Sequence, residues 1–297
     1  MKKLRLYYEE YNKKPYQLLW RHFMPQHFAM FGLIILCVLL TIALVSPFMN
    51  PHDPYLQNSE LLLVPPSWQG NGLVSYPFGT DDLGRDLMSR LMLGASYSFG
   101  LAILAVLGAM LVGILLGSLA GMTRGVQSSI FNHLLDLALT IPSLLLAIVI
   151  VAVLGPGLLN TIWAIMLAML PQFIHGVGNA IQQQLKQDYV VAYRLDGANN
   201  WQILWSVVLP NLWEPVSLLF TMALSTAILD IAALGFLGLG AQAPTPEWGS
   251  MIADALDSIY LAPWTVALPG LLIFITVLSI NLVGDGLHKA MKKRRES

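Results

Sequence analysis

Long apolar runs are the strongest pattern in this sequence, and six of them are long enough to cross a membrane. A hydrocarbon core about 30 Å thick takes roughly 20 apolar residues of helix. Runs near that length occupy residues 28–49, 96–121, 133–154, 160–177, 213–237 and 264–287. The pattern therefore predicts an all-α, polytopic membrane protein with six transmembrane helices.

The hydrophilic stretches between these runs divide the chain into further segments. Only Gly155-Pro156-Gly157 separates the third run from the fourth, so these two spans are expected to form a hairpin. Connections much longer than a simple turn usually carry a function. The expected segments are a lead-in (1–27), the first span (28–49), an outer loop (50–95), a core of five spans (96–287) with an inner loop (178–212) and a last outer loop (238–263), and a basic tail (288–297).

Lysine and arginine fall almost entirely on one side of this arrangement. With a cytoplasmic N-terminus, the inner segments hold 14 of the 16 basic residues, and the outer segments hold only Arg85 and Arg90. The positive-inside rule therefore places both termini in the cytoplasm. A signal peptide is the alternative for the first run, but the run of about 22 residues exceeds an ordinary h-region, which favours an uncleaved span. The stretch before it, with Tyr16 and Trp20 among basic residues, suits the inner membrane surface.

Composition agrees with a membrane protein and removes several functional classes. Hydrophobic residues make up 56% of the chain and charged residues 11%, with a net charge of −1 that gives no general attraction to nucleic acid. Cys37 is the single cysteine, so no internal disulfide can form. The sequence contains no P-loop, zinc motif or cysteine-pair cluster. The chain is therefore predicted to be non-catalytic and to bind no metal or cofactor itself, so that a partner must supply energy for uphill transport.

Acidic residues near membrane depth are few: Asp136, Glu214, Asp230 and Asp285. A row of such acids would indicate a proton-coupled carrier. These four lie near predicted span ends or stand alone, which favours helix capping or an interhelical hydrogen bond. A secondary transporter would also need inverted repeats, and a membrane enzyme would need clustered catalytic side chains. The sequence shows neither pattern.

The inner loop contains a charged segment that is able to form a helix. Asp188–Leu195 has no helix breaker, and Tyr189 and Tyr193 share one face at a spacing of four residues. Gly197 suits the left-handed residue that ends a helix, and Pro210 interrupts a second helix before the fifth span. The pattern predicts a helix-turn-helix elbow that projects into the cytoplasm. A loop resting on the inner membrane surface fits the same pattern equally well.

Two outer motifs combine turn residues with charge or an aromatic anchor. In Phe78-Gly79-Thr80-Asp81-Asp82-Leu83-Gly84-Arg85-Asp86, the glycines allow tight turns, and Arg85 between Asp82 and Asp86 predicts ion pairs that fix the loop. A rigid lid or packing against a partner is the favoured role, with contact to a binding protein or solute as the alternative. The stretch Pro244-Thr245-Pro246-Glu247-Trp248-Gly249 predicts a rigid turn suited to an external gate or docking surface.

Small residues and prolines predict how the spans pack and bend. Gly113, Gly117 and Gly121 repeat every four residues along the second span, a spacing that lets two helices approach closely in lipid. Packing inside the bundle is the favoured role, and a seam with a second subunit is the alternative. Pro142 and Pro171 are expected to kink the third and fourth spans.

The inner loop resembles the EAA loop of ATP-binding-cassette importer permeases. In that family the loop carries an alanine-containing triplet, then a glycine, and ends with Leu-Pro. In this sequence Val191-Ala192-Tyr193 occupies the position of the triplet, Gly197 that of the glycine and Leu209-Pro210 that of the closing pair. This chain departs from the family at Val191 and Tyr193, which replace an acid and an alanine, and at Ser206-Val207, where an Arg-His pair is often found.

From about Ala29 to its C-terminus, the chain resembles the oligopeptide/dipeptide/nickel (DppC/OppC-type) permeases. The outer motifs carry this resemblance, together with Gly235-Phe236-Leu237-Gly238-Leu239-Gly240 and Asn281-Leu282-Val283-Gly284-Asp285-Gly286. Within the family, Arg194-Leu195-Asp196-Gly197-Ala198 and the overall length most resemble the Sap-type peptide permeases, a branch linked to antimicrobial-peptide resistance.

The resemblance implies a permease subunit of an ATP-driven peptide importer in the cell inner membrane. Its partners would be a second homologous permease, two ABC ATPase subunits that hold ATP and Mg, a periplasmic solute-binding protein and the lipid bilayer, without nucleic acid. Dipeptide, heme, nickel or polyamine transport is the alternative.

The same resemblance implies two groups of site residues. The ATPase-coupling loop would consist of Asp188, Tyr189, Ala192, Tyr193, Arg194, Asp196, Gly197, Leu209 and Pro210. The periplasmic motifs would consist of Gly79, Thr80, Asp81, Gly84, Arg85, Asp86, Pro246, Trp248 and Gly249. The motifs are expected to lie beneath the solute-binding protein, with Asp86 and Trp248 as positions for crosslinking to it.

Overall fold

The computed structural model describes residues 15–123 and 126–296. Within these ranges the chain forms helices and turns, and no strand is present beyond one isolated antiparallel bridge between Thr80 and Asp86. The all-α prediction is therefore confirmed. Residues 1–14 of the expected lead-in, together with Arg124 and Ser297, lie outside the described ranges.

In the part of the chain that the structure describes, five helices are long and apolar enough to cross a membrane, and a bent pair can supply a sixth span. The five are α3 (His27–Val45), α4 (Leu87–Met122), α7 (Leu158–Gln184), α10 (Trp213–Phe236) and α12 (Trp264–Glu296). The bent pair is the C-terminal part of α5 (Val126–Leu139), residues His133–Leu139, with α6 (Ser143–Leu154); the two meet at 86°. Pro142 precedes α6 directly and disfavours a helical conformation at Ile141, so the helix expected for the third span is broken here rather than gently kinked. Pro171, by contrast, lies inside an unbroken α7.

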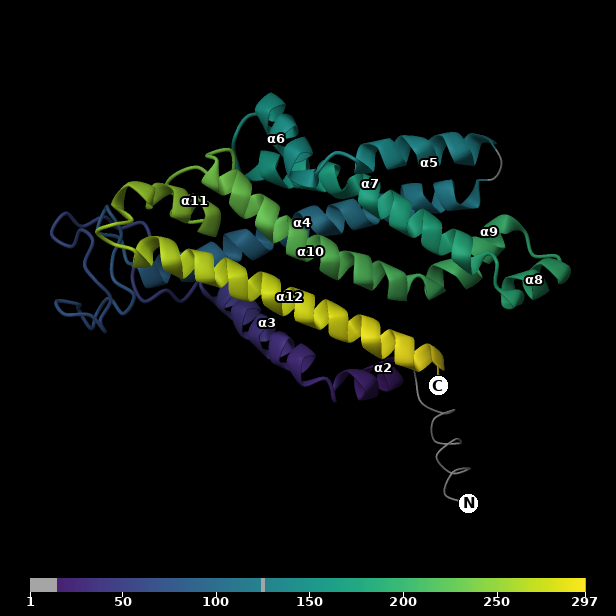
Figure 1. Cartoon of the computed structure of the whole chain (residues 1–297), viewed down its shortest axis with the longest axis horizontal. Helices are drawn as coiled ribbons and strands as arrows, with labels where there is room; N and C mark the ends of the chain where they lie inside the picture. Colours follow the sequence, from purple (N-terminus) through teal and green to yellow (C-terminus); the bar gives the residue numbers. More distant parts are fainter. Residues whose placement is uncertain (1–14, 124–125, 297) are drawn as a thin grey trace, which may run out of the picture.

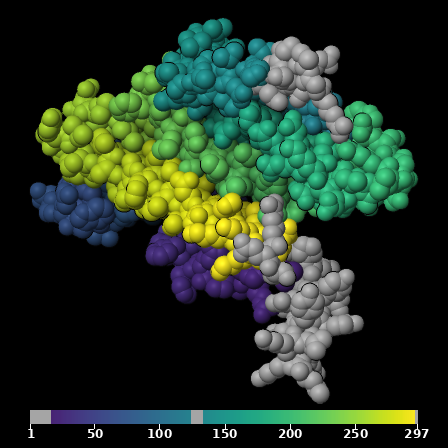
Figure 2. Space-filling view, turned by 45° about the vertical axis from the view of Figure 1, so that its right-hand side comes forward, coloured from purple at the N-terminus to yellow at the C-terminus, as the bar shows by residue number. Residues whose placement is uncertain are grey.

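The remaining helices are short and lie toward the two ends of the bundle (Figure 1). One end carries the loop of residues 50–86 and α11 (Trp248–Asp254), followed by η3 (Leu256–Ser258). The other end carries α8 (Asp188–Leu195), α9 (Asn200–Ile203), a π-helical turn η1 (Leu204–Val208) and η2 (Leu209–Asn211). Helix α2 (Pro15–Phe23) lies beside the C-terminal end of α12. Figure 2 shows the same separation of the green α8–α9 region from the outer-loop segments.

Helices α4 and α7 share the most extensive helix–helix contact among the described residues, and glycines line the side of α4 that meets α7. The three glycines are Gly113, Gly117 and Gly121. A Cβ on Gly117 would lie 2.8 Å from Val177 Cβ, and one on Gly121 would lie 2.9 Å from Ile181 Cβ. Hydrogen alone fits in these positions, so the stripe faces a helix of the same chain. Buried side chains of both helices belong to the main apolar core, so this contact lies within it.

The outward faces of the long helices are apolar. Phe28 on α3 is 79% exposed, Val153 on α6 is 81% exposed and Leu159 on α7 is 73% exposed. Contiguous apolar surface of this kind is unusual on a soluble monomer and is what lipid contact requires. The structure therefore agrees with the multi-pass membrane prediction.

The substitution Gly117→Ala tests the α4–α7 contact. The new methyl group would lie 2.9 Å from the carbonyl oxygen of Ile174, a backbone atom that cannot rotate away. We expect the free energy of unfolding to fall by about 1–3 kcal/mol. Gly100→Ala on the same helix is the control, because a Cβ there meets nothing within 4 Å. Thermal unfolding of both variants in one detergent measures the difference, and equal melting temperatures would contradict the close contact.

Candidate functional site

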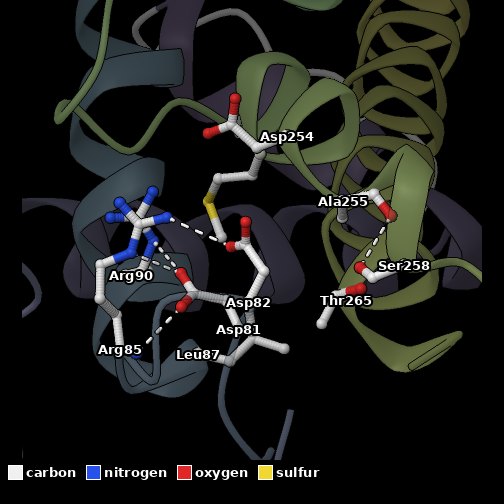
Figure 3. Close-up of a pocket in the computed structure, with 10 residues that line it drawn as sticks. Asp81, Asp82, Arg85, Leu87, Arg90, Asp254, Ala255, Ser258 and Thr265 are labelled. Carbon is white, nitrogen blue, oxygen red and sulfur yellow. Dashed lines mark hydrogen bonds and ion pairs between the residues drawn. The ribbon is translucent and has the colours of Figure 1, made fainter. Parts of the chain in front are cut away.

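A buried ion cluster joins the outer loop to the start of α4 (Figure 3). Asp81 Oδ2 lies 2.6 Å from Arg85 Nε and 3.3 Å from Arg90 Nε, and all three side chains are buried. Arg85 Nη2 also lies 3.8 Å from the more exposed Asp82 carboxylate. Two guanidinium groups thus share one buried carboxylate, and removing that carboxylate would leave both without their main counter-charge.

The motif around Asp81 folds the loop that carries this cluster. Asp81 Oδ1 accepts hydrogen bonds from the backbone N–H groups of Leu83 (3.0 Å) and Arg85 (2.9 Å). Gly84 has φ +72°, and a Cβ there would overlap the carbonyl of Asn58. The buried Thr80 hydroxyl accepts a hydrogen bond from Val64 N–H and donates one to the carbonyl oxygen of Leu61. Gly79 also has positive φ, at +79°. The motif is therefore a tightly bonded turn.

Asp86 does not pair with Arg85, contrary to the expectation from their adjacency. Its carboxylate caps α4 by accepting a hydrogen bond from Ser89 N–H at 3.1 Å, and it lies 3.3 Å from His52 Nδ1. Arg85 turns to Asp81 and Asp82 instead, because the capping geometry directs Asp86 toward the helix.

Arg90 connects the two outer loops, a role that the sequence did not reveal. Its Nη1 donates to the carbonyl oxygens of Pro54 at 3.3 Å and Pro244 at 3.5 Å. One feature of the sequence could have indicated this role. Arg90 is an arginine one turn inside an apolar helix, on the predicted outer side, which carries almost no basic residues.

The second outer motif is anchored inside the bundle. Trp248 is fully buried, and its indole N–H donates to the carbonyl of Leu91 at 3.0 Å. Glu247 is also buried and accepts hydrogen bonds from Ser98 Oγ (2.9 Å) and Ser250 N–H (3.0 Å), while burial raises the pKa of its carboxyl. Pro246 is buried beside them, and Gly249 lies directly against the backbone of Ala232.

This burial changes the expected role of two residues. Neither Trp248 nor Asp86 presents a surface to a partner, so both are unsuitable positions for crosslinking to a binding protein. Exposed side chains at the same end of the molecule are Trp68, Val74, Tyr260 and Leu261.

The space between the ion cluster and α11 is too small for a solute. Figure 3 shows Asp254 of α11 above Asp82, around a cavity of about 10 Å³. This volume holds about one water molecule. Partial burial raises the pKa of the Asp82 carboxyl, and the neighbouring Asp81 charge adds to the increase. The cluster is therefore a structural joint between the outer loop and the start of α4, and no solute fits between it and α11.

The opposite end of the molecule forms a helix-turn-helix elbow, as the sequence predicted. Helix α8 ends in a Schellman motif: Ala198 N–H bonds to the carbonyl of Tyr193 at 3.0 Å, and Gly197 N–H bonds to that of Arg194 at 3.1 Å. Gly197 has φ +85°. Helix α9 then begins with a reciprocal capping box between Asn199 and Gln202. Pro210 lies in the irregular turn η2 just before α10.

The elbow has a buried side and an exposed side. Its buried apolar side chains pack against the end of α7 and the start of α10; they are Val190, Ile203, Leu204, Val207, Val208 and Leu212. We call the opposite side the elbow patch; its exposed side chains are Tyr189, Val191, Tyr193, Leu195, Trp201 and Trp205. Ala192, Asp188 and Asp196 are also exposed, and Leu209 is partly buried. Exposed apolar residues among charges are typical of a protein-binding surface.

The C-terminal part of α12 is tied to the base of this elbow. Arg294 Nη2 lies 3.1 Å from Glu214 Oε2, and its guanidinium lies 5.1 Å from the ring centroid of Trp213. Helices α10 and α12 are thereby linked next to the point where α10 meets the elbow. The pair also explains why Glu214 is tolerated near a span end.

Comparisons with known proteins agree on one family. The family model described as "Binding-protein-dependent transport system inner membrane component" matches residues 113–297, and "N-terminal TM domain of oligopeptide transport permease C" matches residues 14–66. The peptide transport system permease protein SapC of Salmonella typhimurium is 48% identical over 92% of each chain. The di/tripeptide transport system permease protein DppC of Pseudomonas aeruginosa is 46% identical over 93% of this chain and 91% of that one.

A solved structure shares the fold at lower identity. A chain of the inward-facing MetNI methionine ABC transporter aligns with a TM-score of 0.56 and 19% identity, covering 71% of this chain and 97% of that chain.

The substitution Asp81→Asn tests the buried ion cluster. It preserves shape but removes the charge between two buried arginines, so we expect the free energy of unfolding to fall by about 3 kcal/mol or more. Asp82→Asn is the matched control, because this carboxylate is half-exposed and 3.8 Å from Arg85, and its loss should cost about 1 kcal/mol or less. Thermal unfolding in detergent measures both. A larger loss for the control would show that Asp82 is the main counter-charge.

Proposed function

The chain belongs to the binding-protein-dependent transport system inner membrane component family of ABC transporter permeases, and from this premise we propose that it imports short peptides. The observation that carries the proposal is the agreement among relatives over nine tenths of the chain. They are named as peptide, di/tripeptide and dipeptide permeases, the last being the Escherichia coli protein at 40% identity. The Sap-type branch is favoured, because SapC proteins of several species match at 42–48%. Heme, nickel or polyamine transport is the second candidate.

The elbow patch is the proposed docking surface for an ATP-binding subunit. Its apolar side chains have no partner among the described residues that would bury them, and the flanking Asp188 and Asp196 make insertion into lipid unfavourable. Its buried side is continuous with α7 and α10. A movement of the bound ATP-binding subunit would therefore be transmitted to α7 and α10, because the elbow is packed against both helices. ATP and Mg would be held by the two ATPase subunits, and this chain would contribute no catalytic group.

The remaining partners follow from the two ends and the sides of the bundle. The periplasmic solute-binding protein would contact the outer end through exposed residues such as Trp68, Val74 and Tyr260. The solute would pass between this chain and a second homologous permease. The only basic residues on the proposed outer side, Arg85 and Arg90, are buried against Asp81, so the exposed basic residues gather at the other end. This distribution supports cytoplasmic termini.

Cysteine labelling in intact cells tests the orientation. Leu195→Cys on the elbow and Leu261→Cys on the outer end are both strongly exposed, at 84% and 75% for the native leucines. In a Cys37→Ala background expressed without the ATP-binding subunits, which would cover the elbow patch, a membrane-impermeant maleimide should label position 261 in cells with a permeable outer membrane and position 195 only after the inner membrane is opened. The Cys37→Ala parent is the control. Labelling of position 195 from outside would reverse the orientation.

The substitution Leu195→Asp tests coupling. This side chain is 84% exposed, so the change should leave folding intact while placing a charge in the elbow patch. We expect co-purification of the ATP-binding subunits and ATP-dependent uptake of a labelled dipeptide to fall at least about tenfold, as for a central interface residue. Leu261→Asp at the opposite end is the matched control and should retain ATPase association.

Two results would contradict different parts of this proposal. Unchanged ATPase association in Leu195→Asp would remove the elbow patch as the docking surface. Uptake of nickel, heme or a polyamine by the parent protein, without peptide uptake, would leave the permease assignment intact and change the solute.

A further inference from the structure

A further cavity, whose wall is largely apolar but carries a few charged side chains, lies away from both sites, where α2 and α3 meet α12. Its volume is about 320 Å³. Basic side chains on its wall are His27, Lys289 and Lys293, and apolar residues on its wall are Phe28, Ala29 and Leu282. None of these belongs to the elbow or to the outer ion cluster.

The cavity is held open by a fixed joint between three helices. Gln26, between α2 and α3, donates through Nε2 to the carbonyl oxygens of His22 and Gly286, both at 3.0 Å. Gly286 lies against Ala29 so closely that a Cβ would overlap it. Phe23, Ala29 and Ala290 are buried together beside this joint. The α2–α3 turn is therefore docked on α12, and the cavity beside it is preformed.

The electrostatics of the cavity favour an anion. Lys289 and Lys293 are one helical turn apart on α12, and the one carboxylate on the wall, Asp285, lies 2.6 Å from Lys289 Nζ. Lys293 is exposed, and no ion pair to it is present among the described residues. The first turn of α3 adds partial positive charge, because its cap residue Gln26 makes no side-chain cap bond.

The surroundings of the cavity favour a lipid over a free anion. Exposed apolar side chains continue from it along α3, beginning with Phe28 and Phe31. On the other side, Trp20 and Met24 are exposed at the end of α2. Figure 2 shows α3, in purple, lying along α12, in yellow. Helix α12 changes from apolar to basic residues near Asp285, so the cavity lies at the boundary between hydrocarbon and headgroups.

We propose that this cavity binds the phosphate headgroup of an anionic phospholipid, whose acyl chains lie against Phe28 and Phe31. The leaflet follows from the proposed orientation and is the inner one. The bound lipid would bridge α3 and α12 and hold α2 at the membrane surface. Basic pockets between transmembrane helices on the cytoplasmic side recognise such headgroups. The site is independent of the transported solute.

Lipid titration of the purified full-length chain, with its co-eluting partner subunits, tests the proposal by native mass spectrometry. The probes are phosphatidylglycerol and phosphatidylcholine with identical acyl chains. We expect tighter binding of phosphatidylglycerol and an affinity loss of about fivefold in Lys293→Gln. Lys293→Arg should retain the affinity. Lys292→Gln is the matched control, because it removes the same charge from a neighbouring residue that does not line the cavity.

Three results would overturn the proposal. Equal binding of the two lipids would show that the headgroup charge is not recognised. An equal loss in Lys292→Gln and Lys293→Gln would show diffuse attraction to the basic tail instead of a site. Displacement of phosphatidylglycerol by millimolar inorganic phosphate would identify free phosphate as the ligand.

Discussion

The close contact between α4 and α7 is the constraint on which both ends of this molecule depend. Gly117 and Gly121 leave no room for a side chain there, so the two helices are fixed against each other along much of their length. The N-terminal end of α4 carries Asp86 and Arg90, which organise the outer loops. The C-terminal end of α7 leads directly into the elbow. One helix pair thus connects the outer joint with the surface proposed to receive the ATPase.

Local patterns in the sequence predicted the features that depend on local chemistry. Apolar runs located the spans, because lipid demands long apolar helices, and Gly197 marked the end of α8, because a left-handed residue there favours glycine. Pro142 located the break in the third span, although its 86° angle depends on how α6 packs. Helix α7 continues to Gln184, past Gly178 where the inner loop was expected to begin, because glutamines sustain a helix without being apolar.

Contacts between distant segments could not be predicted in the same way. Arg90 meets Pro244 across 154 positions of sequence, and Ser98 meets Glu247 across 149. No local propensity encodes either contact. The isolated acids were easier to interpret: Asp230 accepts an interhelical hydrogen bond from Ser143 at 2.8 Å, as its solitary position favoured. The motif of residues 78–86 could be recognised in the sequence. That Arg85 pairs with Asp81 and not with Asp86 could not be predicted, because it depends on Asp86 capping α4.

The shared carboxylate of Asp81 has a consequence for how related sequences diverge. Two guanidinium groups rely on it, and both are enclosed. A lineage that replaces the acid must lose or neutralise an arginine at nearly the same time, because the intermediate genotype holds uncompensated charge in a dry environment. These three positions are therefore expected to covary as a set, while Asp82, at the solvent edge, drifts freely.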